Sequence, residues 1–354
     1  MRETGGKWRG GPPLGLKLLA ILKSCLYIMD MKNCEDYSLL EIVRQKKHHQ
    51  PDGRFKNPWL PYEAPKLAKI FKWKLSHLIV KENSRFPVFS LSPSLLCGEN
   101  GPIISFLAHN TVFLRLSGKN FLFDPIFGNI SGIIKRHTPP PLAPENLPPI
   151  DFIIYSHAHR DHLDLQSLRK IPGTPKIITP LNFSLYLGNS IVELDWLETY
   201  EESSLLIRAV PVQHWSKRNI GDTNLALWAG FIIETPEFKI FFGGDTGYFF
   251  GFKELGALFG PFDLALVPSG AYLPRELMAP FHLSPEEAVK VCQELGASLG
   301  TPIHWGAYKL GDEALDDPPK LFKKQALKQG VKPLIIYPGE VVFLSNGRPV
   351  FLTS

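Results

Sequence analysis

The chain has 354 residues, of which 44% are hydrophobic and 21% are charged, and it carries a formal net charge of +5. This length can bury a substantial core in one large α/β domain or two smaller ones, and the mild positive charge lacks the concentrated Lys/Arg stripe of a dedicated nucleic-acid binder. No C-x-x-C pair occurs, so neither a disulfide framework nor a zinc knuckle is indicated by the four cysteines, Cys25, Cys34, Cys97 and Cys292.

We interpret residues 1–50 as an N-terminal extension and residues 51–354 as a single domain. Within the extension, an apolar run from Leu14 to Met29 superficially suggests a signal peptide or a membrane span. Lys17 and Lys23 interrupt this run, its length is short for a bilayer crossing, and no small-residue cleavage site follows. We therefore expect a protein that is cytoplasmic or peripheral on a membrane, with the extension as an unstructured or partly helical tail or as a peripheral anchor.

The segment from Lys66 to Val80 combines apolar residues near helical spacing with interleaved lysines around Trp73. This composition is typical of a helix that lies in a lipid interface, with its lysines near phosphate headgroups. A helix packed on its own domain would show a similar apolar stripe, so the sequence leaves both interpretations open.

From Ile103 to Ile126 the pattern indicates β-structure. Val112 to Leu116 and Phe121 to Phe123 flank the turn Ser117-Gly118-Lys119-Asn120, which predicts a hairpin. A proline-rich connection over residues 138–149 then leads to a short apolar strand at Phe152-Ile153-Ile154-Tyr155.

That strand runs directly into His157, His159, Asp161 and His162. Imidazole and carboxylate groups need partners when they are withdrawn from water, and metal ions are the simplest partners for such a cluster. His157 and His159 alternate across one residue, so they can point the same way and share one ion, while Asp161 and His162 can reach a second. Nitrogen and carboxylate ligands without thiolates suit zinc, with manganese or iron as alternatives.

Three later apolar segments end in a similar way. Residues 206–212 run into His214, residues 238–242 into Asp245, and residues 298–303 into His304. Each of these polar residues alone would be ordinary, but the repeated order of strand and then ligand predicts that they complete a site for two metal ions.

Other elements are predicted between and after these segments. We expect a short helix over Asp164–Lys170, strands at Lys176–Pro180, Leu225–Glu234 and Leu264–Pro268, and closing strands at Leu334–Tyr337 and Glu340–Leu344. Ser284 and Glu287 are expected to form a capping box, with Pro285 as the first helical residue, at the start of a helix that continues through Leu295.

Three further residues are candidates for contact with substrate phosphate. Lys217 and Arg218 follow His214 and could bind a phosphate oxygen, although paired basic residues on a loop are often simply solvated. His282 precedes the Ser284 cap, where the positive end of a helix would meet an anion. His282 could bind phosphate or assist the leaving group, or it could be a structural loop histidine.

At these residues the sequence resembles the metallo-β-lactamase superfamily, whose zinc ligands follow the same order. It is most similar to the N-acyl-phosphatidylethanolamine-hydrolysing phospholipase D branch. The local motifs that carry this similarity are Gly53–Trp59, Phe123–Phe127, Leu147–Asp151, Gln213–Trp215 followed by Lys217-Arg218, Gly244–Tyr248, Gly260–Asp263, Gly270–Tyr272 and Ile303–Gly306. One departure is Ala108-His109-Asn110-Thr111, which keeps the histidine of the family's Gly-His-Ala-Thr stretch but replaces both small neighbours.

The resemblance implies an α/β fold in the form of a four-layer αβ/βα sandwich, with the metals at the seam between its two sheets. We assign His157, His159 and His214 to the first ion. Asp161, His162 and His304 are assigned to the second ion, and the carboxylate of Asp245 bridges both. Asp124 and His109 are expected beside the ligands, with Asp124 orienting one of them through a hydrogen bond.

The implied function is a dinuclear zinc phosphodiesterase that cuts phospholipids of the N-acyl phosphatidylethanolamine type on the headgroup side, with Asp161, Asp245 and His282 as catalytic residues. We expect a phospholipid substrate, contact with a membrane surface and no nucleic-acid partner, and the oligomeric state, a homodimer included, stays open. The alternatives are hydrolysis of another substrate, such as a lactone, a cyclic phosphate or RNA, and a non-catalytic metal-binding protein at a membrane.

Overall fold

A computed structural model gives the fold and describes residues 38–60, 84–97, 101–345 and 348–352. The chain divides into two compact units, Met1–Lys46 and Lys47–Ser354, and the described part of the first holds helix α2 (Leu39–Arg44). The extension up to residue 37 and the segment Lys66–Val80 lie outside the described residues. Within the described ranges, no helix is both long and apolar enough to cross a bilayer.

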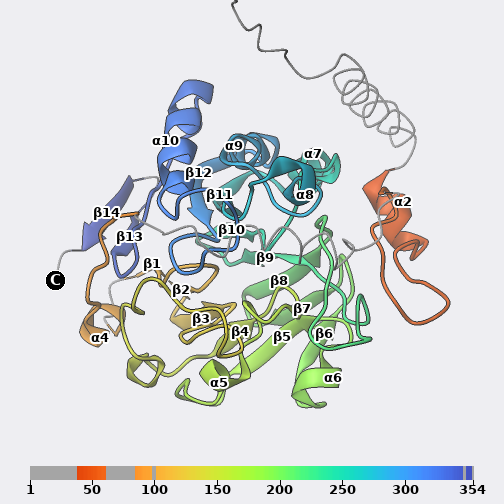
Figure 1. The fold of residues 1–354 in the computed structure, drawn as a ribbon, viewed down its shortest axis with the longest axis horizontal. Coiled ribbons are helices and arrows are strands. Elements are labelled where there is room, and N and C mark those ends of the chain that lie inside the picture. Colours follow the sequence, from red (N-terminus) through yellow and green to blue (C-terminus); the bar gives the residue numbers. More distant parts are fainter. Residues whose placement is uncertain (1–37, 61–83, 98–100, 346–347, 353–354) are drawn as a thin grey trace, which may run out of the picture. The chain divides into compact units, whose positions relative to one another are not determined.

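Two mixed β-sheets form the framework of the second unit (Figure 1). The larger sheet is antiparallel from its β14 edge to β3 and parallel from β3 to β6. In spatial order its eight strands are β14 (Arg348–Leu352), β13 (Val341–Ser345), β1 (Ile103–Phe106), β2 (Val112–Leu116), β3 (Lys119–Phe123), β4 (Phe152–Ile154), β5 (Lys176–Pro180) and β6 (Val192–Leu194).

The smaller sheet is parallel from β10 to β12 and antiparallel from β10 to β7. In spatial order its six strands are β12 (Ala297–Ile303), β11 (Phe262–Pro268), β10 (Lys239–Phe242), β9 (Gly230–Glu234), β8 (Leu205–Val210) and β7 (Thr199–Glu202).

Helices cover the outer faces of the two sheets (Figure 1). Helix α9 packs on β11 and β12, and α5 and α6 supply side chains to the apolar cluster on the other sheet. The described helices of the second unit are α4 (Pro93–Leu96), the 3₁₀ turn η1 (Pro144–Asn146), α5 (Leu165–Leu168), α6 (Ser184–Leu187), α7 (Gly251–Phe259), α8 (Arg275–Met278), α9 (Pro285–Glu294) and α10 (Asp317–Gln329). The four-layer sandwich is therefore confirmed.

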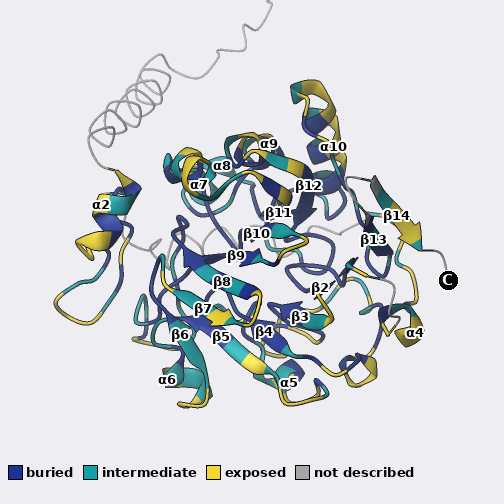
Figure 2. Ribbon diagram, turned by 180° about the vertical axis from the view of Figure 1, so that it is seen from behind, coloured by how far each residue is buried: buried dark blue, intermediate teal, exposed yellow. Residues whose placement is uncertain are grey.

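Side chains alternate between the two faces of each strand, which explains why the core has one part under helices α5 and α6 and another between the two sheets. Leu122 and Ile153 are paired residues of β3 and β4 that join the cluster under α5 and α6. Their neighbours face the other sheet, and the rings of Phe123 and Phe242 meet across the seam with centroids 4.6 Å apart. Successive strand residues point to opposite faces, so the apolar runs Phe121–Phe123 of β3 and Phe152–Ile154 of β4 are buried on both sides, and Figure 2 shows buried residues in both strands.

Two predicted strands are partly or wholly wrong. Leu334–Tyr337 forms no strand, because Pro333 and Pro338 flank it and cannot donate to a ladder, and only an isolated bridge joins Pro333 to Gly300. The strand predicted over Leu225–Glu234 begins only at Gly230. The backbone N–H groups of Leu227 and Ala229 instead donate to the carbonyl groups of Leu181 and Ser156, which ties this segment to the loops of the larger sheet.

Candidate metal centre

The seven predicted ligands come from both sheets. The loop after β4 carries His157, His159, Asp161 and His162. His214, Asp245 and His304 follow β8, β10 and β12 of the smaller sheet. All seven side chains are buried or half-buried where the two sheets face each other, and the structure brings them together.

The first group consists of His157, His159 and His214. Their candidate ligand atoms all lie within 4.8 Å of one another, and His214 Nε2 is 3.3 Å from His159 Nδ1. Two ligands at tetrahedral angles on one zinc ion are about 3.3 Å apart, because zinc–nitrogen bonds are about 2.0–2.1 Å long. The facing nitrogens of His159 and His214 therefore have the spacing of two ligands on one ion, and His157 lies close enough to supply a third.

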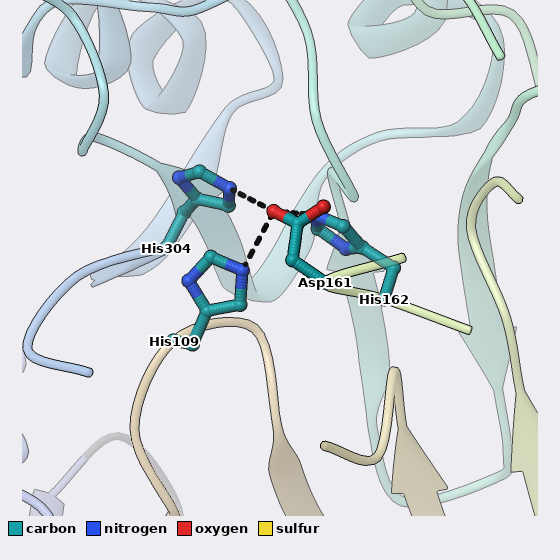
Figure 3. Close-up of side chains that lie close together, drawn as sticks. All are labelled: His109, Asp161, His162 and His304. Carbon is teal, nitrogen blue, oxygen red and sulfur yellow. Dashed lines mark hydrogen bonds and ion pairs between the residues drawn. The ribbon is translucent and has the colours of Figure 1, made fainter. Parts of the chain in front are cut away.

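The second group consists of Asp161, His162, His304 and also His109 (Figure 3). Asp161 Oδ2 lies 3.4 Å from His162 Nε2 and 3.9 Å from His304 Nε2. The same oxygen is 3.1 Å from His109 Nε2, and the His109 ring packs against that of His304 with centroids 4.3 Å apart. His109 thus contacts two of the candidate ligands from the larger sheet's first hairpin.

Asp245 lies between the two groups. Its Oδ2 atom is 3.1 Å from His304 Nε2 and 3.2 Å from His162 Nε2. On the other side, the same atom is 3.9 Å from His157 Nε2 and 3.8 Å from His214 Nε2. One carboxylate within reach of both groups is the arrangement that a bridging ligand requires.

Several buried polar atoms of this cluster have no hydrogen-bond partner among the described residues. They include Nε2 of His157, His162 and His304, and Oδ1 of Asp245. Buried polar atoms are rarely left without a partner, because each unpaired group costs about 1–3 kcal/mol. Bound cations would satisfy these atoms, and a set of imidazoles and carboxylates without thiolates fits zinc.

A hydrogen-bond network fixes the histidines of the β4 loop. Asp124 Oδ2 is 2.7 Å from His162 Nδ1, and the same carboxylate accepts from Ser156 Oγ at 2.6 Å and from Asn110 Nδ2 at 3.0 Å. Ser156 Oγ also lies 2.9 Å from His157 Nδ1. Partners of this kind hold ligand rings in the tautomer and orientation that metal binding needs. The sequence indicated the role of Asp124 but assigned none to Ser156 or Asn110.

His214 is held from a different direction. Its Nδ1 atom is 3.0 Å from the carbonyl oxygen of Phe281, and Asn57 Nδ2 donates to its backbone carbonyl at 2.7 Å. Trp59 Nε1 donates to the neighbouring Gln213 at 3.1 Å. The Gly53–Trp59 motif therefore positions the His214 loop, a role that could have been found only through its position in the family pattern.

Backbone conformations around the centre are unusual. His109, Asp124 and His304 have positive φ angles of 59°, 38° and 64°, a region that non-glycine residues rarely occupy. Two backbone hydrogen bonds tie His109 to the segment His304-Trp305, from His304 N to His109 O and from His109 N to Trp305 O, both 2.7 Å. Strained residues of this kind persist where the surroundings determine them, and they gather at functional sites.

Charges in the cluster are set by burial and by close neighbours. Burial lowers the pKa of His159 to about 4 and of His109 to about 3, so both are neutral near pH 7. Burial also opposes a charge on His304, but attraction to Asp245 and the nearby carboxylate of Asp161 raise its pKa to about 9. Although burial would raise the pKa of Asp245, His304 and His162 hold it well below its usual range. The carboxylates are thus ionised, as metal binding requires.

The three candidate phosphate contacts differ in their placement. His282 lies at the centre, with Nδ1 3.9 Å from Asp245 Oδ2 and its side chain 15% exposed. Arg218 instead donates to the carbonyl of Leu163 and lies over the Tyr186 ring, so the structure does not bring its guanidinium to the histidines. Lys217 is half-buried on the same loop.

Comparison with known proteins agrees with this architecture. Residues 119–305 match the family model described as the beta-lactamase superfamily domain. A metallo hydrolase from the archaeon Ignicoccus hospitalis shares the fold with a TM-score of 0.54 and 19% identity over 72% of this chain and 99% of its own. An isothiocyanate hydrolase from Delia radicum gut bacteria also shares the fold, with a TM-score of 0.56 and 20% identity over 68% of this chain and 99% of its own. The fold and the centre define a metal-dependent hydrolase.

Sequence relatives give the branch. The chain is 34% identical to N-acyl-phosphatidylethanolamine-hydrolyzing phospholipase D 1 of Caenorhabditis elegans over 277 residues, which cover 70% of this chain and 78% of the relative. It is 28% identical to a metal-dependent hydrolase of Thermococcus onnurineus over 248 residues, which are 68% of this chain and 99% of the relative. The chain belongs to the metallo-β-lactamase superfamily, in the branch that resembles N-acyl-phosphatidylethanolamine-hydrolysing phospholipase D.

Proposed function

We propose that this metal-dependent hydrolase binds two zinc ions and cleaves phospholipids of the N-acyl phosphatidylethanolamine type on the headgroup side. The observation that carries the dinuclear centre is the position of Asp245 between two groups of histidines, each of which includes a buried ring nitrogen without a hydrogen-bond partner among the described residues. The substrate class follows from the relative in Caenorhabditis elegans and from a mitochondrial enzyme of the same name in Saccharomyces cerevisiae, to which the chain is 32% identical over 66% of its length.

His157, His159 and His214 would hold the first ion, and Asp161, His162 and His304 the second, with Asp245 shared. Ions bound there would supply an activated water molecule near neutral pH and would withdraw negative charge from the phosphate. Asp124 and Ser156 keep the rings of His162 and His157 in place during turnover. His109 holds the Asp161 carboxylate through its Nε2 atom.

His282 contributes a hydrogen bond to the substrate phosphate. Burial lowers its pKa to about 4, so the imidazole is neutral at pH 7 and is poorly suited to deliver a proton to the leaving alcohol. A neutral imidazole still offers one N–H group to a phosphate oxygen. The proton for the leaving group then comes from water.

The test is incubation of the zinc-loaded protein with a phospholipid panel, followed by identification of the products by mass. N-acyl phosphatidylethanolamine should give phosphatidic acid and an N-acylethanolamine. Diacylglycerol as the lipid product would place the cut on the other side of phosphorus and would reject the phospholipase D assignment. Turnover of a lactone or a cyclic phosphate, with every lipid intact, would favour the alternative hydrolase.

A further inference from the structure

Arg160 joins two surface loops beside the metal centre. It lies between the candidate ligands His159 and Asp161, on the exposed side of the β4 loop. Its guanidinium donates to Ser131 Oγ at 3.3 Å, to Asn219 Oδ1 at 3.0 Å and to the carbonyl of Arg218 at 2.9 Å. The loops 129–137 and 215–221 are therefore neighbours, although they are far apart in the sequence.

Each of these two loops presents an isoleucine to solvent. Ile220 is 102% exposed and Ile133 is 82% exposed, the two highest values among the large hydrophobic side chains that the structure describes. Both side chains belong to loops joined by the same arginine beside the candidate active site. A single exposed isoleucine is ordinary, but two on adjoining loops beside the candidate ligands indicate a contact surface.

Both loops are held rigidly in this conformation. The tip of the first is closed by hydrogen bonds between Ile130 N and Ile134 O and between Ile133 N and Ile130 O, both 3.0 Å. In the second, the buried Asp222 carboxylate accepts from Arg218 N at 3.0 Å and from Asn219 N at 2.8 Å. The isoleucines are thus held outward by structured turns, so binding through them requires little further ordering of the loops.

The charge of the two loops is uniformly positive. Residues 129–137 include Lys135 and Arg136, residues 215–221 include Lys217 and Arg218, and neither loop contains Asp or Glu. Arg160 adds a fifth cation between them. The guanidinium groups of Arg136 and Arg218 donate to backbone carbonyl groups of Leu107 and Leu163, whereas Lys135 and Arg160 are exposed and Lys217 is half-buried. Exposed apolar tips with exposed basic side chains beside them match an anionic lipid surface, in which apolar groups insert and cations lie near phosphates.

The geometry points to these two loops as a docking surface that seats the metal centre on an anionic phospholipid bilayer. This inference rests on the proposed function, because N-acylation removes the ammonium charge of phosphatidylethanolamine and makes the substrate itself an anionic lipid. The loop 215–221 begins beside His214, and Trp215 packs on the His159 ring with centroids 4.5 Å apart. Docking through these loops would therefore bring lipid headgroups to the candidate ligands.

The test compares the zinc-loaded full chain with the double variant Ile133→Ser/Ile220→Ser. Binding is measured by sedimentation with vesicles of phosphatidylcholine that contain phosphatidylglycerol, and hydrolysis is measured on the water-soluble bis(4-nitrophenyl) phosphate. The double variant should lose at least about tenfold in vesicle affinity and keep its rate on the soluble diester. A matched control is Leu327→Ser/Val350→Ser, which removes exposed apolar side chains from α10 and β14 and should bind as the wild type does.

A second variant tests the charge. Lys135→Gln should weaken binding to the anionic vesicles by about fivefold and leave any binding to pure phosphatidylcholine unchanged. Equal vesicle binding by the double variant and the wild type would overturn the docking surface, as would a wild-type protein that binds neither vesicle. Loss of vesicle binding in the double variant, with no hydrolysis of any phospholipid by the wild type, would support the surface and reject the proposed substrate.

Discussion

At the scale of single residues, Asp245 has the largest consequence for the centre, because it is the one side chain that we assign to both ions. Its Oδ2 atom lies within 4 Å of a histidine nitrogen in each group. Removing the carboxylate takes away the negative charge that lies near the four imidazoles of His157, His162, His214 and His304 and that would neutralise part of the charge of bound metal ions. A loss of metal and a loss of rate should therefore occur together.

We predict that Asp245→Ala lowers the zinc content from about two ions to about one per chain and reduces hydrolysis of a soluble diester at least about 10³-fold. Elemental analysis of the dialysed protein and initial rates are the measurements. Asp263→Ala is the control, since this exposed carboxylate at the start of β11 accepts only from the backbone of Lys239 among the contacts described. A normal rate in the Asp245 variant would refute the shared-ligand assignment.

Among the elements, the turn after β10 shows how closely the two sheets approach at the centre. Gly244 has φ of +58°, and a Cβ atom placed there would lie 2.5 Å from Ser156 Cβ. Ser156 in turn contacts Asp124 and His157. A side chain at position 244 would therefore push directly on the network that orients the β4 loop.

We predict that Gly244→Ala lowers the free energy of unfolding by about 2–4 kcal/mol, the sum of a positive-φ penalty and a steric clash. Gly118→Ala isolates the first effect, because Gly118 has φ of +73° and a Cβ atom added there would meet no other atom within 4 Å. In urea unfolding, the free energy of unfolding of that control should be only about 1 kcal/mol lower than that of the wild type. Equal losses in the two variants would show that the sheets separate easily at this point.

The segment 48–59 is held by hydrogen bonds from its first two residues, His48 and His49, to the buried carboxylate of Asp195. Asp195 accepts from His48 at 2.7 Å and from His49 at 2.8 Å, one imidazole on each oxygen. Burial would raise the pKa of Asp195, but the hydrogen bond and charge of His48 and the hydrogen bond of His49 hold it below its usual value. This contact lies at one end of the segment whose other end holds His214.

We predict that Asp195→Asn lowers the free energy of unfolding by about 2–4 kcal/mol at pH 6. A lowered carboxyl pKa gives stability that is fully present above the unfolded value of about 4 and is lost as the pH falls through the folded value. The difference between wild type and variant in urea unfolding should therefore shrink below about pH 4. Asp52→Asn, at an exposed carboxylate of the same segment, should show no such difference, and a pH-independent gap would contradict this account.

The sequence predicted elements well wherever a local pattern determined the structure. The strand Lys176–Pro180 and the capping box of Ser284 and Glu287 depend on neighbouring residues alone, and both are confirmed. The candidate ligands were visible because each follows an apolar strand. Ser156, Asn110 and the Phe281 carbonyl could not be predicted, because ordinary polar groups acquire their roles only through contacts between distant segments.

At the scale of the whole molecule, each proposed ion connects the two sheets. The first group takes His157 and His159 from the larger sheet and His214 from the smaller one. The second takes Asp161 and His162 from the larger sheet and His304 from the smaller one. A metal that binds only the assembled pair of sheets stabilises the folded state by mass action.

We predict that chelation lowers the thermal midpoint by about 5 °C or more, because a free metal concentration about a thousandfold above Kd contributes about 4 kcal/mol. Returning zinc should restore the midpoint, as measured by scanning calorimetry. Asp245→Ala should show a smaller difference between its chelated and zinc-loaded forms. Identical midpoints for the chelated and loaded wild type would mean that the two sheets associate independently of the ions.

The contribution of both sheets to each ion has a consequence for synthesis on the ribosome. The histidines at positions 157, 159 and 162 are made long before His304, so a growing chain holds half of each ligand set without its complement. In a chain arrested at that stage the imidazoles would be exposed to solvent and could bind any available metal ion, whereas in the folded protein His157 and His162 are buried. Correct loading therefore belongs after translation, when the last strands of the smaller sheet are in place.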